Sequence, residues 1–301
     1  MNVDITVAIA TRDRPAKLAR CLAGVLAGTA SPGEIVVIDQ GAGEEARRAI
    51  AAANSTVPVV YVQQAARGLS ASRNAAVTVA RYPIIAVIDD DCVPDRAWIA
   101  TIATVFAMPD PPAAVTGRVL PLGPERQGYY AISTRASLVR REYQARAAPW
   151  EVGTGGNFAA RRAWLARIGP YDERLGTGTS GRAGEDMDLL YRLIRVGARV
   201  RYEPNALIYH ERQNYAHRRA SRIGYGWGIG AFCGLWLRRR DPYMMVLLAR
   251  WSGARLWALA GAARRGQWGR LCDEVLMLGG AVRGLLGGLA LGSRSPAMGE
   301  Q

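Results

Sequence analysis

The chain contains 301 residues, of which 50% are hydrophobic and 21% charged. This composition excludes general intrinsic disorder and allows a sizeable core without disulfides or structural metals. The formal net charge is +14, which suggests nucleic acid, an anionic membrane or a phosphorylated substrate as a partner. Residues 212–301 hold 14 arginines against four acidic residues, whereas residues 1–211 are nearly balanced.

The first 120 residues alternate between strand and helix patterns. Apolar runs predict buried strands at 3–10, 34–39, 57–62 and 84–88. Helical segments are expected after them, at 14–26, 44–53, 69–80 and beyond Pro94. This alternation predicts an α/β fold whose mostly parallel sheet carries helices on both faces. Ligands of such sheets bind beyond the carboxyl ends of the strands.

The pattern is more mixed between residues 113 and 210. We expect strands at 113–120, 199–202 and 206–210, and helices around 131–146, at 161–168 and at 185–196. Two glycine-rich segments, 153–157 and 176–184, are predicted to be loops.

From about residue 215 the chain becomes helical, rich in tryptophan and basic. Arg250 and Arg255 interrupt the one apolar stretch that is long enough to span a bilayer, which takes about 20 apolar residues. The tryptophans of this region include those at positions 236, 251, 257 and 268. We therefore expect an amphipathic helical extension on a membrane surface. The alternative is an ordinary helical subdomain that packs its apolar face on the core.

Three consecutive carboxylates, Asp89, Asp90 and Asp91, follow the fourth predicted strand. Adjacent carboxylates repel one another and are best tolerated where a cation balances them. Asp89 and Asp91, as alternate residues of an extended segment, point to the same side. This arrangement suits a divalent cation that carries a diphosphate. The alternative is a solvated acidic loop that caps the next helix.

Other candidate residues carry weaker signals. Glu185 and Asp186 begin a helix after the glycine-rich loop, where acidic residues are favoured in any case. His210 ends a strand and is a candidate metal ligand beside the acidic triplet. We expect Asp188 to be a helix-start or solvent-facing acid, and His217 to lie on the surface.

The remaining motifs point away from other classes of site. None of the four cysteines forms a CxxC pair, so we expect reduced structural thiols in a cytosolic protein. The first residues show no basic segment followed by an apolar run, so no secretory signal is expected. GYGWGIG at 224–230 does not follow a strand, which argues against a dinucleotide site.

Taken in order, five segments of residues 3–212 resemble family 2 inverting glycosyltransferases of the GT-A fold. They are VAIATRDRPAKLARCL, EIVVIDQG, GLSASRNAA, AVIDDDCVP, and the pair GTGGNFAARRAWLARIGPYDERLG with GEDMDLLYRLIRVGARVRYEPNALIYHE. The resemblance implies a Rossmann-like, mostly parallel sheet flanked by helices. It also implies a nucleotide-sugar-binding half at 1–120 and an acceptor-binding half at 121–212, with the helical extension at 213–301.

The resemblance assigns the nucleotide site to the first half. Asp39 would bind the base, with Thr11 and Arg12 lining its pocket. Gln40 stands where the family often has a second Asp, so a second carboxylate contact is not implied there. Arg73 would contact the base or the phosphates.

The acidic triplet would hold the diphosphate. Asp89 would face the ribose, and Asp90 would belong to the nucleotide-sugar site. Asp91, Asp89 and His210 would bind a divalent cation, Mn²⁺ or Mg²⁺.

The acceptor side would supply the base of the reaction. Asp186 would be the general base, and Glu185 would hold the acceptor hydroxyl. Gly155, Gly156 and Asn157 would belong to the acceptor-binding segment. The chain would then be a metal-dependent enzyme that transfers a sugar from a nucleotide-diphosphate sugar to a glycan or lipid-linked acceptor in cell-envelope synthesis.

Two rival functions make different predictions. A sugar nucleotidyltransferase needs a glycine-rich basic loop after the first strand, and ATRDRPAK contains no glycine. A nucleic-acid-binding protein needs basic and aromatic residues on a sheet or groove, whereas the sheet edge here is acidic. We therefore expect no nucleic-acid partner, and a peripheral position on the cytoplasmic face of an anionic membrane. The sequence does not indicate the oligomeric state.

Overall fold

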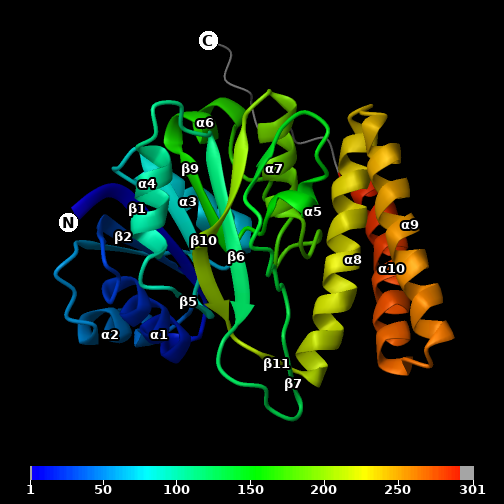
Figure 1. Cartoon of the computed structure of the whole chain (residues 1–301). Helices are drawn as coiled ribbons and strands as arrows, with labels where there is room; N and C mark the ends of the chain where they lie inside the picture. Colours follow the sequence, from blue (N-terminus) through cyan, green and yellow to red (C-terminus); the bar gives the residue numbers. More distant parts are fainter. Residues whose placement is uncertain (1, 292–301) are drawn as a thin grey trace.

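The structure is a computed structural model that describes residues 2–291 (Figure 1). The last ten residues of the predicted extension lie outside the described range. The central sheet has the strand order β3 (Val59–Gln63), β2 (Ser31–Asp39), β1 (Asn2–Thr11), β4 (Ile84–Asp89), β9 (Asn157–Arg161), β6 (Ala114–Pro121), β10 (Val200–His210) and β5 (Cys92–Pro94), with β8 (Arg141–Tyr143) beside β10. A two-stranded sheet pairs β7 (Tyr129–Tyr130) with β11 (Gln213–Asn214).

The sheet confirms the predicted α/β class. β3, β2, β1 and β4 are mutually parallel, and β6 is parallel to β10. β9 lies antiparallel between β4 and β6, and joins the two halves of the sheet. β9 was not predicted from the sequence, because the glycine-rich residues 153–157 that lead into it have the composition of a loop.

Alternating side chains along the strands build one core on each face of the sheet. Val7 and Val37 belong to the core beneath α1 (Pro15–Leu26), α2 (Glu45–Ala52) and α4 (Trp98–Phe106). Ala8 and Val36 belong to the opposite core beneath α3 (Leu69–Val79), α6 (Arg162–Ile168) and α7 (Glu185–Arg195). The short helix α5 (Pro149–Val152) precedes β9. The helices thus cover both faces, as the alternating pattern predicted.

The structure corrects two predictions in the second half. The helix expected around 131–146 is absent; this region is mainly irregular and contributes β8, which pairs with β10 at its first residues, Val200 to Tyr202. That pairing satisfies backbone groups on the exposed edge of β10, a requirement that local helical spacing does not reveal. The strands expected at 199–202 and 206–210 are one strand, with an irregular register between Glu203 and Leu207.

Three long helices complete the chain and form a bundle beside α7 (Figure 1). They are α8 (Tyr215–Arg238), α9 (Tyr243–Arg264) and α10 (Trp268–Ala290). Within residues 2–291, no helix combines the length and the apolarity that crossing a bilayer requires.

Glycines let α8 and α10 approach each other closely. Gly226 and Gly230 of α8 lie against backbone carbonyls of α10, while Gly284 and Gly288 of α10 lie against backbone carbonyls of α8. A Cβ atom at any of these positions would overlap the opposing backbone. Spacing by four residues places such glycines on one helix face. The GYGWGIG segment is therefore a helix-packing motif.

We predict that Gly284→Val lowers the free energy of unfolding by about 1–3 kcal/mol, because the added side chain meets the carbonyl oxygen of Trp227. Gly279→Ala, on the same helix, is the control. That position is exposed and nothing lies within 4 Å of the added Cβ, so the control should be neutral or stabilising. Urea unfolding of both variants measures the difference, and equal stabilities would contradict the packing role.

Candidate active site

The sheet brings the predicted residues to one edge. Thr11 is in register with Asp39 on β2, and Ala10 with Asp89 on β4, so the carboxyl ends of three parallel strands coincide. Further along this edge, His210 at the end of β10 is in register with Cys92 on β5, which directly follows Asp91. The first turn of α7 supplies Glu185 and Asp186.

The three carboxylates of the triplet have different surroundings. The side chain of Asp90 is 1% exposed, accepts a hydrogen bond of 2.7 Å from the Thr11 hydroxyl and pairs with Arg14 at 3.0 Å. Burial raises its pKa to about 6, against the lowering effect of Arg14. The side chain of Asp89 is 33% exposed and that of Asp91 is 12% exposed. Asp90 therefore joins the ends of β1 and β4 through Thr11 and Arg14.

Asp91 and His210 form the best candidate metal centre among the described residues. Their nearest atoms, Asp91 Oδ1 and His210 Nε2, lie 3.5 Å apart, and the thiol of Cys92 is within the same cluster. His210 Nδ1 lies 2.8 Å from the carbonyl oxygen of Glu211, which can only accept, so Nδ1 donates. With the proton of a neutral imidazole on Nδ1, Nε2 would present its lone pair beside Asp91, the orientation that a metal-ligating histidine needs. Asp89, the other predicted ligand, is not in this cluster.

Arg73 is a buried cation that joins the two acidic groups. Its guanidinium is 3% exposed, donates to Glu185 Oε1 at 2.8 Å and donates to Asp89 Oδ1 at 3.1 Å. It also lies over the ring of Tyr171, 5.6 Å from the centroid. The two carboxylates raise the pKa of Arg73 above its usual range, against the effect of burial. Among the described residues, the guanidinium is thus held by acidic side chains from two elements.

Glu185 and Asp186, the acid pair at the start of α7, differ in burial. Glu185 is 7% exposed; burial and the neighbouring Asp186 raise its pKa to about 7, against the effect of Arg73. Asp186 is more exposed, and its carboxylate accepts hydrogen bonds from the backbone N–H of Gly155 at 2.9 Å and of Met187 at 2.8 Å. These two donors hold Asp186 in place while leaving it partly open.

Two glycines permit this convergence. A Cβ on Gly155 would lie 2.7 Å from Arg73 Nη1 and 2.8 Å from the Cβ of Asp186. A Cβ on Gly156 would overlap the carboxylate of Asp89. The next residue, Asn157, is the first residue of β9. It is 2% exposed and binds Trp98 and two backbone carbonyls, so it fastens β9 within the sheet.

A cavity of about 290 Å³ opens beside the end of β2, lined among others by Asp13, Arg14, Asp39 and Gly41. Asp39 accepts hydrogen bonds from the N–H of Gly41 at 2.7 Å and from the Tyr61 hydroxyl at 2.9 Å. A Cβ on Gly41 would lie within 3.0 Å of both Asp13 Oδ1 and Asp39 Oδ1. Two carboxylates therefore share one wall of this cavity.

The neighbours of the cavity divide into exposed and buried side chains. Arg12 is largely exposed and pairs with Asp13, whereas Thr11 is buried. Gln40, also buried, binds Gly68 just before α3 and Ser72 in the first turn of that helix. Sequence reasoning missed the roles of Arg14 and Tyr61, although a basic residue after the first strand, opposite three acids, was a visible signal.

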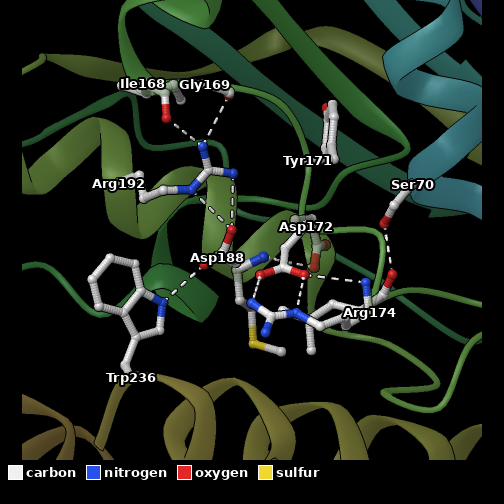
Figure 2. A network of polar contacts seen from close by, with 12 residues as sticks. Ser70, Ile168, Gly169, Tyr171, Asp172, Arg174, Asp188, Arg192 and Trp236 are labelled. Atoms are coloured by element: carbon white, nitrogen blue, oxygen red, sulfur yellow. Dashed lines mark hydrogen bonds and ion pairs between the residues drawn. The ribbon is translucent and has the colours of Figure 1, made fainter. Parts of the chain in front are cut away.

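A buried polar network behind α7 ties the site to the helical bundle (Figure 2). Asp188 is fully buried; it accepts from Arg192 at 2.9 Å and from the indole N–H of Trp236, on α8, at 2.8 Å. The solvent-facing position expected for Asp188 is wrong, because the bundle covers it. Asp172, in the loop before α7, binds Arg174 and also Arg239 at the end of α8. His217, by contrast, is exposed as predicted.

Backbone contact reinforces this support. Gly184, immediately before α7, has φ +94°, and a Cβ there would lie 2.7 Å from the carbonyl oxygen of Gly228 on α8. A left-handed backbone conformation and close packing both require glycine at this position. The start of α7, which carries the acid pair, is therefore fixed by α8.

We predict that Asp188→Ala lowers the free energy of unfolding by about 3–5 kcal/mol, because Arg192 loses its buried carboxylate partner. Trp236→Phe, which leaves the Arg192 ion pair intact, should cost less, about 1.5–3 kcal/mol. Urea unfolding with a double-mutant cycle measures the coupling. Losses below about 0.5 kcal/mol in both variants would contradict the role of this network.

Comparison with known proteins places these features in a family. Residues 6–169, more than half of the chain, match the family described as "Glycosyl transferase family 2". A pre-mycofactocin glycosyltransferase from Mycobacterium tuberculosis is 28% identical over 236 residues, which cover 76% of this chain and 47% of that protein. A glucosyl-dolichyl phosphate glucuronosyltransferase from Haloferax volcanii is 25% identical over 221 residues, 71% of each chain.

A solved structure shares the fold at low sequence identity. A mannosyltransferase from Pyrobaculum calidifontis, in complex with GDP-Man and Mn²⁺, has a TM-score of 0.65 at 18% identity, covering 94% of this chain and 87% of that one. The chain spans about half the length of the Mycobacterium tuberculosis relative. The GT-A fold expected from the sequence is confirmed, and the chain belongs to glycosyl transferase family 2.

Proposed function

We propose that this chain is a metal-dependent, inverting glycosyltransferase that moves a sugar from a nucleotide diphosphate to an acceptor hydroxyl. One observation carries the proposal. The buried Arg73 guanidinium holds Asp89 of the acidic triplet on one side and Glu185, the neighbour of Asp186, on the other. One fixed cation thus connects a carboxylate of the proposed nucleotide-sugar site with the residue next to the candidate base.

Asp186 has the properties of a general base for this reaction. It is partly open to solvent, and two backbone N–H groups fix its carboxylate. A hydroxyl placed against it would lose its proton as the oxygen attacks the anomeric carbon from the face opposite the departing diphosphate. Such proton removal contributes about 10²–10⁴ in rate. Glu185, held by Arg73, would orient the acceptor hydroxyl through its other oxygen.

The residues present fit a divalent cation. Asp91 offers a carboxylate oxygen, and His210 offers Nε2 because its Nδ1 is committed to a carbonyl. We assign these two as the protein ligands, with Asp89 toward the ribose and the sugar. When bound, Mn²⁺ or Mg²⁺ would neutralise the charge that develops on the diphosphate. The mannosyltransferase with a similar fold is a Mn²⁺ complex, which supports a divalent cation here.

The cavity at the end of β2 is the proposed base site. Asp39 and Asp13 present acceptors to the N–H groups of a base, which is compatible with uracil, thymine or guanine. In this division of the chain, residues 1–120 bind the nucleotide sugar and residues 121–212 bind the acceptor.

We infer an acceptor on a cell-envelope glycan or a lipid-linked sugar, with the chain working at the cytoplasmic face of a membrane. Three of the four cysteines are buried and all four are free, which suits a reducing compartment. The surplus of arginine in residues 213–301 favours an anionic surface. One relative carries a dolichyl phosphate in its name, an example of a lipid-linked substrate in a similar protein. The acidic sheet edge argues against nucleic acid as partner.

Asp186→Asn should lower sugar transfer by about 10²–10⁴, because the amide cannot accept the acceptor's proton, while nucleotide-diphosphate binding stays unchanged. The matched control is Asp110→Asn, the same chemical change at a side chain that is 85% exposed and pairs with Arg199. Initial rates and calorimetric nucleotide binding separate the two effects. Near-normal transfer by the Asp186→Asn variant would remove the assignment.

His210→Ala should weaken Mn²⁺ binding by about tenfold or more, since it removes a proposed ligand. The chain provides its own control in His217→Ala, because His217 is the second of its two histidines and is exposed. Titration of Mn²⁺ in the presence of UDP or GDP, followed by electron paramagnetic resonance, measures the affinity. Equal affinities in the two variants would exclude His210 from the metal site.

The function as a whole is tested by screening nucleotide sugars for binding and hydrolysis with Mn²⁺, with Mg²⁺ and with a chelator. We expect one class of nucleotide sugar to be bound and slowly hydrolysed, with chelator abolishing the hydrolysis. Tight binding of random DNA or RNA, together with no response to any nucleotide sugar, would favour the nucleic-acid alternative.

A further inference from the structure

The outer face of the helical bundle exposes apolar side chains along its full length. On α10, seven of the exposed residues follow each other at intervals of three and four: Trp268, Cys272, Val275, Gly279, Val282, Leu286 and Leu289. Val275, Val282 and Leu286 are 50%, 62% and 64% exposed. Spacing of this kind forms one continuous stripe on a helix. The opposite face of α10 is the glycine face that packs on α8.

Helix α9 has the same two-sided construction. Met244, Leu247 and Trp251 are buried in the bundle, whereas Met245 and Trp257 are 57% and 76% exposed. α9 and α10 lie side by side at the edge of the molecule farthest from β1 and β2 (Figure 1). We call the exposed apolar residues of these two neighbouring helices, Met245 and Trp257 together with the α10 stripe, the α9–α10 face. Exposed apolar surfaces of this extent usually mark an interaction site.

The surplus charge around the α9–α10 face is positive among the residues that the structure describes. Residues 213–291 contain twelve arginines and three acidic residues. Each acid is engaged: Asp241 with Tyr191, Asp273 with Arg218 and Arg222, and Glu274 with Arg255. The turn between α9 and α10 exposes Arg264, Arg265 and Arg270, close in sequence to Trp268.

This charge pattern favours an anionic membrane over a second copy of the chain as the partner of the α9–α10 face. A second copy would bring against this face another surface with the same surplus of arginine, which is unfavourable. An anionic bilayer instead offers apolar chains for the stripe, headgroup phosphates for the arginines, and an interface in which indole rings are favoured. We propose that the α9–α10 face lies in the surface of an anionic phospholipid bilayer.

The position of the α9–α10 turn relates this face to the candidate active site. α8 begins five residues after His210, at the end of β10 that carries the proposed metal site. The first turns of α8 hold the start of α10 through the ion pairs of Arg218 and Arg222 with Asp273. The turn with its exposed arginines thus lies at the end of the molecule where the site opens. The proposed function explains why this is useful, since a lipid-linked acceptor would then lie near Asp186.

Flotation of the full chain with vesicles tests the face. We expect recovery with vesicles of phosphatidylglycerol and phosphatidylcholine, weaker recovery at high salt, and little with phosphatidylcholine alone. Arg264→Glu with Arg265→Glu should weaken binding by about tenfold or more. Trp257→Ser with Trp268→Ser should also weaken it, and both indoles are at least 75% exposed, so the fold is spared.

The matched control is Arg161→Glu with Arg167→Glu, which reverses the same number of charges on and next to α6, at the opposite end of the molecule (Figure 1). It should float like the unmodified chain. All variants should keep nucleotide-diphosphate binding. Loss of vesicle binding in a variant that still binds the nucleotide diphosphate would therefore support membrane contact by the α9–α10 face, even if sugar transfer is never found.

Three results would overturn the proposal. One is failure of the unmodified chain to float with anionic vesicles. Another is an equal loss of binding in the control and the Arg264/Arg265 variants, which would show a general charge effect. The third is a dimer in sedimentation that the Trp257/Trp268 variant separates while vesicles recover nothing, which would make a second copy the occupant.

Discussion

A buried guanidinium sets the geometry of the whole candidate site. A charge taken out of water must be paired, and Arg73 is paired by Asp89 from the end of β4 and Glu185 from the start of α7. These two elements come from different halves of the chain, so the ion pairs fix the distance between the acidic triplet and the acid pair. The backbone can pass between them only because positions 155 and 156 lack side chains. Asp186 then remains the partly open carboxylate of its pair.

The helical bundle serves this geometry as well as its own surface. Gly184 meets Gly228 backbone to backbone, and Asp188 binds Trp236, so α8 holds α7 from behind. The tryptophans of the extension have two different roles, which the amino-acid composition alone does not distinguish. Trp236 and Trp251 are turned inward, whereas Trp257 and Trp268 face outward with the arginines. The two interpretations of the extension, packing on the core and contact with a membrane, therefore apply to different faces of the same helices.

The net charge of +14 has a local explanation. The acidic side chains of the catalytic part meet at strand ends and at the start of α7, and many are balanced by nearby arginines. In residues 213–291 the acids are too few to balance the arginines, and the surplus reaches the surface. The acidic residues are proposed to perform the chemistry, and the surplus arginines are proposed to attach the chain to a membrane.

The sequence alone determined the features that depend on local order. Alternating strand and helix periods predict the α/β sheet; three acids after an apolar strand predict the anion-rich edge, and glycine before Glu185 predicts the start of α7. The features that only the tertiary structure reveals depend on partners that are distant in the sequence. β9 enters the sheet from a segment with the composition of a loop, because the strands on either side of it supply its hydrogen bonds. Residues 131–146 lack the expected helix, since β8 pairs with the edge of β10. Arg73 is buried between acids of β4 and α7, and Asp188 is buried with Arg192 of its own helix beneath Trp236 of α8. A charged side chain has no preferred side until the fold surrounds it.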